Sequence, residues 1–414
     1  MQQYKAEIIS IGNEVLAGFT VNTNATFISQ QLLEVGIPVN WITTIRDEHG
    51  EILSALKNAQ TRADAVLVTG GLGPTPDDLT KKAICDYFQV ALRFDEASHQ
   101  NVKRYLESRN IKPSESNRNQ AIIPDCDYVI QNNVGTAPGL VFKRDNTYYF
   151  FMPGVPNEMK SIVNGYILDF LKRKLKSIPV YSALLRTTGI PESRLYERLQ
   201  PVLINYPEIQ VSYLPRYIGV DLRFRLISAD KSAEEHIQNM IREVSKVAGR
   251  YIFCDQEKEL EQVVGELLTE KGLTLSTAES FSGGLIADQI TNIPGSSNYF
   301  TSGLVTYSNQ SKMELLGVDE KTLIDFGAVS SQTALEMVLG VQNRFNTDCA
   351  ISTTGIAGPG GATDTKPVGL CYVAVRYGNS ENVKEFRFGT NRLVNKKRGA
   401  VAGLEMLRRL ILEL

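Results

Sequence analysis

Histidine is scarce in this sequence, which limits the acid–base chemistry that the chain can perform. Only three histidines occur in 414 residues, His49, His99 and His236, and none lies in a recognisable motif. The sequence therefore offers few histidines that could complete a Ser-His-Asp triad. If a serine of this chain hydrolyses a substrate, we expect a base other than histidine to take its proton.

Cysteine is also sparse. The five cysteines are an odd number and form no Cys-x-x-Cys pair. This pattern favours neither a disulfide framework nor a zinc site, so we expect buried free thiols.

Strong charge and long apolar runs are absent as well. The formal net charge is -2, which disfavours nucleic acid as the main partner and leaves only a local basic patch open. The N-terminal residues lack a basic region followed by an apolar one, and no apolar run reaches membrane-spanning length. We expect a cytoplasmic protein without a membrane partner.

The first part of the chain alternates between strand and helix patterns. Such alternation predicts an α/β fold with a parallel sheet, in which ligands bind at the carboxyl ends of the strands. The strands are expected at residues 6–12, 38–45 and 64–71, and the helices at 22–36 and 51–63.

The length of 414 residues exceeds what one hydrophobic core usually organises. We predict three domains, with boundaries at 1–176, 177–254 and 255–414. The middle one is a small α+β unit of a strand, a helix, two strands and a helix. Its strand at 220–228 puts Arg223 and Arg225 on one face, where they could bind RNA phosphates, face solvent or contact another domain.

The C-terminal domain is a second α/β unit in which three loops follow strands: "AESFSGG", "YSNQSK" and "TTGIAGPGG". Loops at one edge of a parallel sheet can converge, so Ser280, Lys312 and Thr354 could meet. A turn at Ser280 would expose its hydroxyl, and a desolvated Lys312 is the best candidate to activate it. The alternatives are that Ser280 caps a helix and that Lys312 is a surface charge.

Two glycine-rich loops could bind phosphate. Residues 352–369 follow a strand and favour phosphate or ribose binding, with a tight structural loop as the alternative. Residues 68–83 precede a helix whose N-terminus favours an anion. Asp77 and Asp78 there could hold a divalent ion, with Glu14 as a further carboxylate, or they could cap the helix.

These motifs together resemble a known family. "GNEVLAG", "TGGLGPTPDDLTKKA", "NVGTAPG" and "MPGVPNEMK" resemble the N-terminal domain of the competence/damage-inducible protein CinA family, which is similar to the molybdopterin-binding fold. "TAESFSGGLIA", "TGIAGPGG" and "KPVG" resemble its C-terminal domain, and the middle unit fits its KH-like domain. The matches cover nearly the whole chain in order.

The resemblance implies two activities. The C-terminal domain would hydrolyse nicotinamide mononucleotide to nicotinate mononucleotide and ammonia without a cofactor. The N-terminal domain would be an ADP-ribose pyrophosphatase that needs a divalent metal ion of unspecified identity, with potassium as a further candidate. The expected partners are these nucleotides and a second copy of the chain in a homodimer.

The resemblance also assigns residues. Ser280 matches the nucleophile and Lys312 the general base, while Tyr307, Thr354 and Arg392 assist catalysis or hold the nucleotide. Further substrate-binding positions are Glu279, Gly283, Gly284 and Gly355. The nucleotide and phosphate positions of the N-terminal domain are Asn13, Glu14, Gly70, Gly71, Gly73, Thr75, Gly135 and Thr136, and its metal ligands are Asp77 and Asp78.

One departure from the family pattern lies beside the nucleophile. Family members commonly read "AESCTGG", whereas Phe281 and Ser282 stand here in place of the cysteine and threonine. The ring of Phe281 could pack away from the pocket or narrow it. Other functions stay open: a nucleotide-binding scaffold without turnover that acts through protein partners, or molybdopterin binding by the N-terminal domain.

Overall fold

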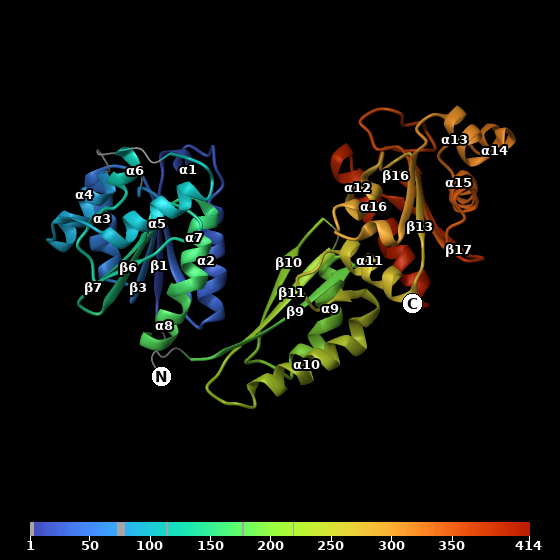
Figure 1. Cartoon of the computed structure of the whole chain (residues 1–414). Coiled ribbons are helices and arrows are strands. Elements are labelled where there is room, and N and C mark those ends of the chain that lie inside the picture. Colours follow the sequence, from blue (N-terminus) through green and yellow to red (C-terminus); the bar gives the residue numbers. More distant parts are fainter. Residues whose placement is uncertain (1–3, 73–78, 113–114, 176–177, 218) are drawn as a thin grey trace. The chain divides into compact units, whose positions relative to one another are not determined.

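The computed structural model describes residues 4–72, 79–112, 115–175, 178–217 and 219–414 (Figure 1). The chain divides into two compact units. Unit 1 comprises Met1–Tyr181 and Leu226–Ala233, and unit 2 comprises Ser182–Arg225 and Glu234–Leu414. Among the described residues, no helix is both long and apolar enough to cross a membrane.

The N-terminal sheet confirms the predicted parallel α/β arrangement. Its strand order is β2-β1-β3-β8-β7-β6. The strands β1, β2, β3 and β8 run parallel, and β7 runs antiparallel to both of its neighbours, β8 and β6. The strands are β1 (Ala6–Ile11), β2 (Val39–Ile45), β3 (Ala65–Thr69), β6 (Tyr128–Ile130), β7 (Gly139–Arg144) and β8 (Thr147–Met152). A separate pair consists of β4 (Leu92–Phe94) and β5 (Ile122–Pro124).

Helices cover both faces of this sheet, which explains why every residue of β1 and β3 is buried. Residues of α2, α7 and α8 form the core on one face, and residues of α3 and α4 form it on the other. The helices are α1 (Asn13–Leu16), α2 (Thr23–Glu34), α3 (His49–Gln60), α4 (Leu79–Phe88), α5 (Glu96–Glu107), α6 (Glu115–Asn119), α7 (Pro156–Ile162) and α8 (Leu168–Leu175), with the π-helical turn η1 (Val163–Ile167) before the last.

The middle segment forms a four-stranded sheet of order β10-β11-β9-β12. The predicted series of strand, helix, two strands and helix is present, and β12 adds an edge strand that the sequence patterns did not indicate. Its elements are β9 (Val180–Thr188), α9 (Glu192–Leu203), β10 (Gln210–Pro215), β11 (Gly219–Ile227), α10 (Ala233–Ala248), η2 (Gly249–Tyr251) and β12 (Ile252–Cys254).

The C-terminal sheet has the order β14-β13-β15-β16-β17. Its first three strands are parallel, and β16 and β17 form the predicted antiparallel hairpin. The strands are β13 (Leu275–Glu279), β14 (Phe300–Val305), β15 (Cys349–Gly355), β16 (Leu370–Tyr377) and β17 (Ser380–Arg387). Because Glu279 pairs with both Val305 and Thr353, the loops that follow these strands emerge at one edge.

Alternating residues of these strands face two separate cores. One core contains residues of α11, α12 and α16, and the other contains residues of α13, α14 and α15. The helices are α11 (Leu260–Lys271), α12 (Leu285–Thr291), η3 (Ser296–Asn298), α13 (Asn309–Leu316), α14 (Glu320–Asp325), α15 (Ser331–Phe345) and α16 (Arg392–Leu412).

The cysteines are free, as their spacing indicates. Only Cys349 and Cys371 are fully buried, whereas Cys85, Cys126 and Cys254 are partly exposed. The expectation of buried thiols therefore holds for two of the five.

Candidate active site

Ser280 lies in a sharp turn between β13 and α12. The backbone N–H groups of Ser280 and Phe281 donate to the carbonyl of Thr353 on the neighbouring strand, at 2.9 and 3.3 Å. Gly283 and Gly284 then adopt φ angles of 61° and 91°, a left-handed conformation that favours glycine. The turn thus leaves the sheet edge steeply, and Ser280 remains partly exposed at its start.

Glu279 fixes this turn by bonding to the start of α12. Its side chain is buried, and its two carboxylate oxygens accept hydrogen bonds from the backbone N–H groups of Ile286 and Ala287 at 3.0 and 2.9 Å. A carboxylate at a helix N-terminus is favoured because the first N–H groups lack partners within the helix. The expectation that Ser280 caps α12 is therefore wrong, since Glu279 provides these contacts; binding of substrate by Glu279 stays a prediction.

Lys312 reaches Ser280 from α13. Its Nζ lies 3.1 Å from Ser280 Oγ and 2.8 Å from the carbonyl oxygen of Thr306. The start of α13 is fixed by a capping box in which the side chains of Ser308 and Ser311 bond reciprocally to backbone N–H groups. Lys312 is only 1% exposed, so the alternative of a surface charge is wrong.

Burial changes the acidity of this amine. Removal from water disfavours the ammonium form and lowers the pKa of Lys312 from 10.5 to about 8. A measurable fraction of the amine is then neutral near neutral pH, and a neutral amine can accept a proton. The pair therefore has the geometry and the acidity of a nucleophile with its base.

Phe281 packs behind the turn rather than into the space in front of Ser280. The ring is 4% exposed and lies in a small apolar cluster with Ala357, Cys371 and Val373. A Cβ atom at Gly399 or at Gly355 would lie within 2.7 Å of the ring, so these two glycines make room for it. The core therefore accommodates Phe281 at the position where family members commonly have cysteine.

Thr354 and Gly355 follow on β15. Thr354 is buried, and its hydroxyl donates to the carbonyl of Ala328 at 2.5 Å. The structure therefore does not bring the Thr354 hydroxyl into contact with Ser280 or Lys312. Its assignment to catalysis stays a prediction, as does substrate binding by Gly355.

Tyr307 and Arg392 form the outer rim of the site. The side chain of Tyr307 is 66% exposed, and its hydroxyl accepts a hydrogen bond of 3.0 Å from Arg392 Nη2. Arg392 Nη1 also donates to the carbonyl of Gly358 in the glycine-rich loop. These contacts join the loop after β14, the glycine-rich loop and the start of α16 at one rim.

Lys396 is a candidate that the sequence patterns did not reveal. It lies one turn after Arg392 on α16, and its Nζ would be 3.2 Å from a Cβ atom at Gly283. The spacing of four residues between two cations at a helix start was the available signal.

A second site lies at the carboxyl ends of the N-terminal strands. Ser10, Thr69 and Met152 align across β1, β3 and β8, and a cavity of about 450 Å³ opens beyond them. Of the predicted positions, Asn13, Glu14, Gly70, Gly71 and Thr136 line this cavity. Gly135 is held tightly beside it, since a Cβ atom there would lie 2.1 Å from the carboxylate of Glu158.

Two acidic residues of this cavity were missed as site residues. Asp47 and Glu158 both line it, and burial raises the pKa of Glu158 although Asn132 donates a hydrogen bond to its carboxylate. Glu158 stands in the quoted motif "MPGVPNEMK", which was the signal available for it.

The predicted metal loop cannot be placed. Gly73, Thr75, Asp77 and Asp78 lie outside the described residues. Within the described ranges, no group of three or more histidine, cysteine, aspartate or glutamate residues is arranged to hold a metal ion. Metal binding therefore stays a prediction.

Comparisons with known proteins match the chain from end to end. Residues 7–173 match the family described as "Probable molybdopterin binding domain", residues 182–254 the "Damage-inducible protein CinA KH domain" and residues 257–411 the "CinA C-terminal domain".

Full-length relatives agree with these matches. A CinA-like protein of Chloroherpeton thalassium is 42% identical over 98% of this chain and 99% of its own length, and one of Dictyoglomus turgidum is 37% identical over 99% and 100%. The crystal structure of the competence/damage inducible protein CihA from Agrobacterium tumefaciens is 44% identical, with 36% of this chain and 93% of that chain covered and a TM-score of 0.36. The chain belongs to the CinA family.

Proposed function

We propose that the C-terminal part of this protein hydrolyses the carboxamide of nicotinamide mononucleotide to nicotinate mononucleotide and ammonia. The contact of 3.1 Å between Ser280 Oγ and the buried amine of Lys312 carries this proposal. A hydroxyl beside a desolvated amine supplies both the nucleophile and the base that an amide hydrolysis needs. The choice of substrate follows the family resemblance of the surrounding motifs.

The reaction would proceed in two halves. The neutral amine of Lys312 takes the proton of Ser280 as Oγ attacks the carboxamide carbon. Lys312 then returns this proton to the departing nitrogen, which leaves as ammonia while the acyl group stays on Oγ. Water, deprotonated by Lys312, attacks the ester, and Oγ recovers its proton as the carboxylate leaves.

The oxyanion of each tetrahedral intermediate needs hydrogen-bond donors. Backbone N–H groups of the turn at Gly283 and Gly284 are the candidates, because this turn precedes α12 and the N–H groups of Ile286 and Ala287 within the helix are already bonded to Glu279. Fixed donors of this kind add no reorganisation at the moment of reaction.

The rim would hold the phosphate of the mononucleotide. Arg392 uses one donor for the carbonyl of Gly358 and one for Tyr307, and a guanidinium has five. The remaining donors and the amine of Lys396 lie on the first turns of α16, where they could bind a phosphate group.

We further propose that the N-terminal cavity binds ADP-ribose and cleaves it to AMP and ribose 5-phosphate. Gly70 and Gly71 have φ angles of 102° and 71° at the end of β3, and such glycines let the backbone approach a pyrophosphate closely. A divalent ion held by Asp77 and Asp78 would polarise the phosphate groups and stabilise the negative charge that develops on them. Since Asp77 and Asp78 lie outside the described residues, we assign them no geometry.

Substitution Ser280→Ala tests the nucleophile. We expect ammonia release from nicotinamide mononucleotide to fall by about a thousandfold or more, since loss of a nucleophile has effects of at least this size. Ser331→Ala, on the first turn of α15, is the matched control and should keep full activity. Unchanged turnover by Ser280→Ala would reject the serine mechanism, and binding without turnover in the parent protein would favour a nucleotide-binding scaffold.

The pH profile tests the base. Only the neutral amine can accept a proton, so kcat/KM for deamidation should rise with pH, reach half its maximum near the pKa of about 8, and level off above it. Lys312→Arg should be inactive throughout, because a guanidinium stays protonated. A profile that falls between pH 7 and 9 would contradict the role of Lys312.

Chelation separates the two activities. Treatment with EDTA should stop cleavage of ADP-ribose, and added Mg²⁺ or Mn²⁺ should restore it, because pyrophosphate cleavage is expected to need a divalent ion. Deamidation in the same sample should be unaffected. Equal loss of both activities would contradict the assignment of separate chemistries.

A further inference from the structure

A cavity of about 480 Å³ lies between the middle segment and the C-terminal sheet within unit 2. Its volume falls within the range of small-molecule sites, which often lie at such junctions. One wall is a single face of α16, formed by residues 398, 401, 402, 405, 406 and 409. The opposite wall comes from the loop between β9 and α9 and the turn between β10 and β11.

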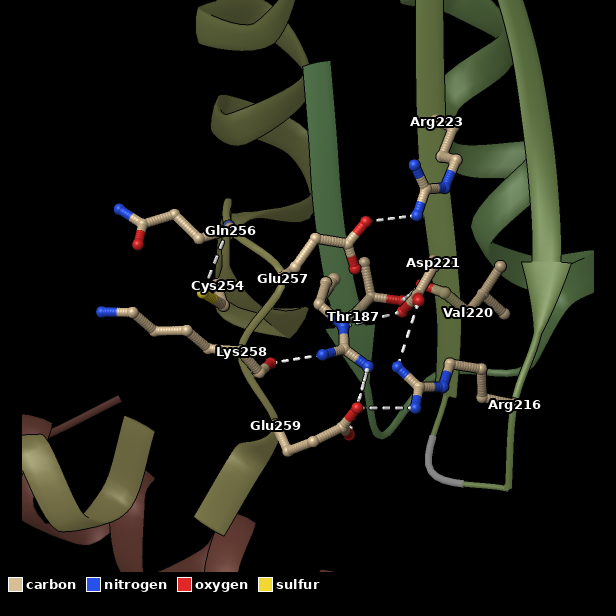
Figure 2. Close-up of polar contacts among 11 residues, drawn as sticks. Thr187, Arg216, Val220, Asp221, Arg223, Cys254, Gln256, Glu257, Lys258 and Glu259 are labelled. Carbon is tan, nitrogen blue, oxygen red and sulfur yellow. Dashed lines mark hydrogen bonds and ion pairs between the residues drawn. The ribbon is translucent and has the colours of Figure 1, made fainter. Parts of the chain in front are cut away.

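Buried polar contacts join the middle sheet to the start of α11, beside the cavity. Arg186, which is 1% exposed, bonds to Asp221 in the middle sheet and to Glu259 at the start of α11. Arg216 bonds to the same two carboxylates at 3.3 and 2.8 Å (Figure 2). Arg216 also lines the cavity, so this network fixes a part of the wall itself.

Figure 2 also shows a contact of Arg223, on β11 of the middle sheet. Arg223 pairs with Glu257, so of the three roles open to this arginine, the contact between domains is the one observed. Because Arg216 is fixed by two carboxylates, its part of the cavity wall is held in place without a ligand.

The cavity combines aromatic surface with positive charge. Phe386 and Phe388 stack with ring centroids 5.6 Å apart, and both rings line the cavity. At one end of the α16 face, Arg398 forms no ion pair with any described residue. At the other end, Arg409 bonds to Glu405 through Nε while its Nη2 is buried without a partner in the described structure.

The spacing of the two arginines restricts the ligand. Arg409 lies eleven positions after Arg398, which corresponds to about 16 Å along a helix. A single phosphate cannot bridge that span, but a mononucleotide with a negatively charged base can, since its phosphate and its base lie at opposite ends. Glu192, which also lines the cavity, could accept hydrogen bonds from ribose hydroxyls.

We propose that this cavity is a second nucleotide site that takes a mononucleotide whose aromatic base carries a carboxylate, the chemical class of the product formed at Ser280. The base stacks on Phe386 and Phe388 with its carboxylate on Arg398, and the phosphate binds Arg409. The choice of a carboxylated mononucleotide as the ligand rests on the proposed function. The cavity and its charged residues are observed independently of that function.

The site shares a wall with the turn at Ser280. The ring of Phe388 lies 6.3 Å from the ring of Phe281, measured between centroids, and Phe281 directly follows Ser280. A ligand against Phe388 therefore contacts the same packed cluster that supports the nucleophile.

Hydrogen–deuterium exchange of the full chain tests this proposal. With Ser280→Ala to prevent turnover, nicotinate mononucleotide should slow exchange in residues 398–409 and 188–192, two segments that line this cavity and exclude the rim residues Arg392 and Lys396. Half-maximal protection should need about tenfold less nicotinate mononucleotide than nicotinamide mononucleotide, because a carboxylate–arginine contact contributes roughly a factor of ten. In the same background, Arg398→Gln should bring the two concentrations within about threefold of each other, since the carboxylate then loses its charged partner. Lys321→Gln, an exposed substitution on α14, should leave the difference intact.

Three results would overturn the proposal. These are no protection of residues 398–409 and 188–192 at saturating nicotinate mononucleotide, equal protection of these residues by both nucleotides in the Ser280→Ala protein, and an unchanged difference in Arg398→Gln. Protection is measured without turnover, so loss of the proposed deamidase activity would not by itself produce any of these results.

Discussion

Burial of the Lys312 amine is the constraint on which the proposed chemistry of this protein depends. An ammonium group removed from water is unfavourable unless it is paired, and burial alone lowers the pKa of Lys312 to about 8. The surrounding structure contributes one carbonyl oxygen, from Thr306, and one hydroxyl, from Ser280. Burial disfavours the ammonium form of Lys312, and the Ser280 hydroxyl lies beside the amine. The neutral amine can therefore accept the proton of that hydroxyl.

The other elements keep this pair in position. Glu279 ties β13 to the start of α12, the capping box fixes α13, and Phe281 fills the space behind the turn. Glu279 and Phe281 fix the turn after β13, and the capping box fixes the helix after β14. These two segments meet because β13 and β14 end at one edge. The N-terminal cavity likewise lies beyond the carboxyl ends of β1, β3 and β8. Both candidate sites therefore lie at the carboxyl edge of a parallel sheet.

Patterns in the sequence predicted the strand–helix alternation of residues 6–71 and of the C-terminal domain, because such alternation and terminal glycines are local signals. They also brought Ser280 and Lys312 to one edge. They did not indicate β12, which pairs at the edge of the middle sheet. They did not predict that Glu279 would cap α12 or that the Thr354 hydroxyl would bond to Ala328, because such partners depend on loop geometry. The position of Phe281 depends on Gly355 and Gly399, which are distant in sequence from it and from each other, and the network around Arg186 likewise needs tertiary contacts.

Direct titration of Lys312 by nuclear magnetic resonance tests the central claim independently of any substrate. The signals of the lysine Cε and Nζ nuclei report protonation, and the signal absent from the Lys312→Arg protein identifies the residue. The account predicts a midpoint near the pKa of about 8 in the free protein. A midpoint near the ordinary lysine value of 10.5 would show that the amine stays charged beside Ser280 and would contradict its role as the base.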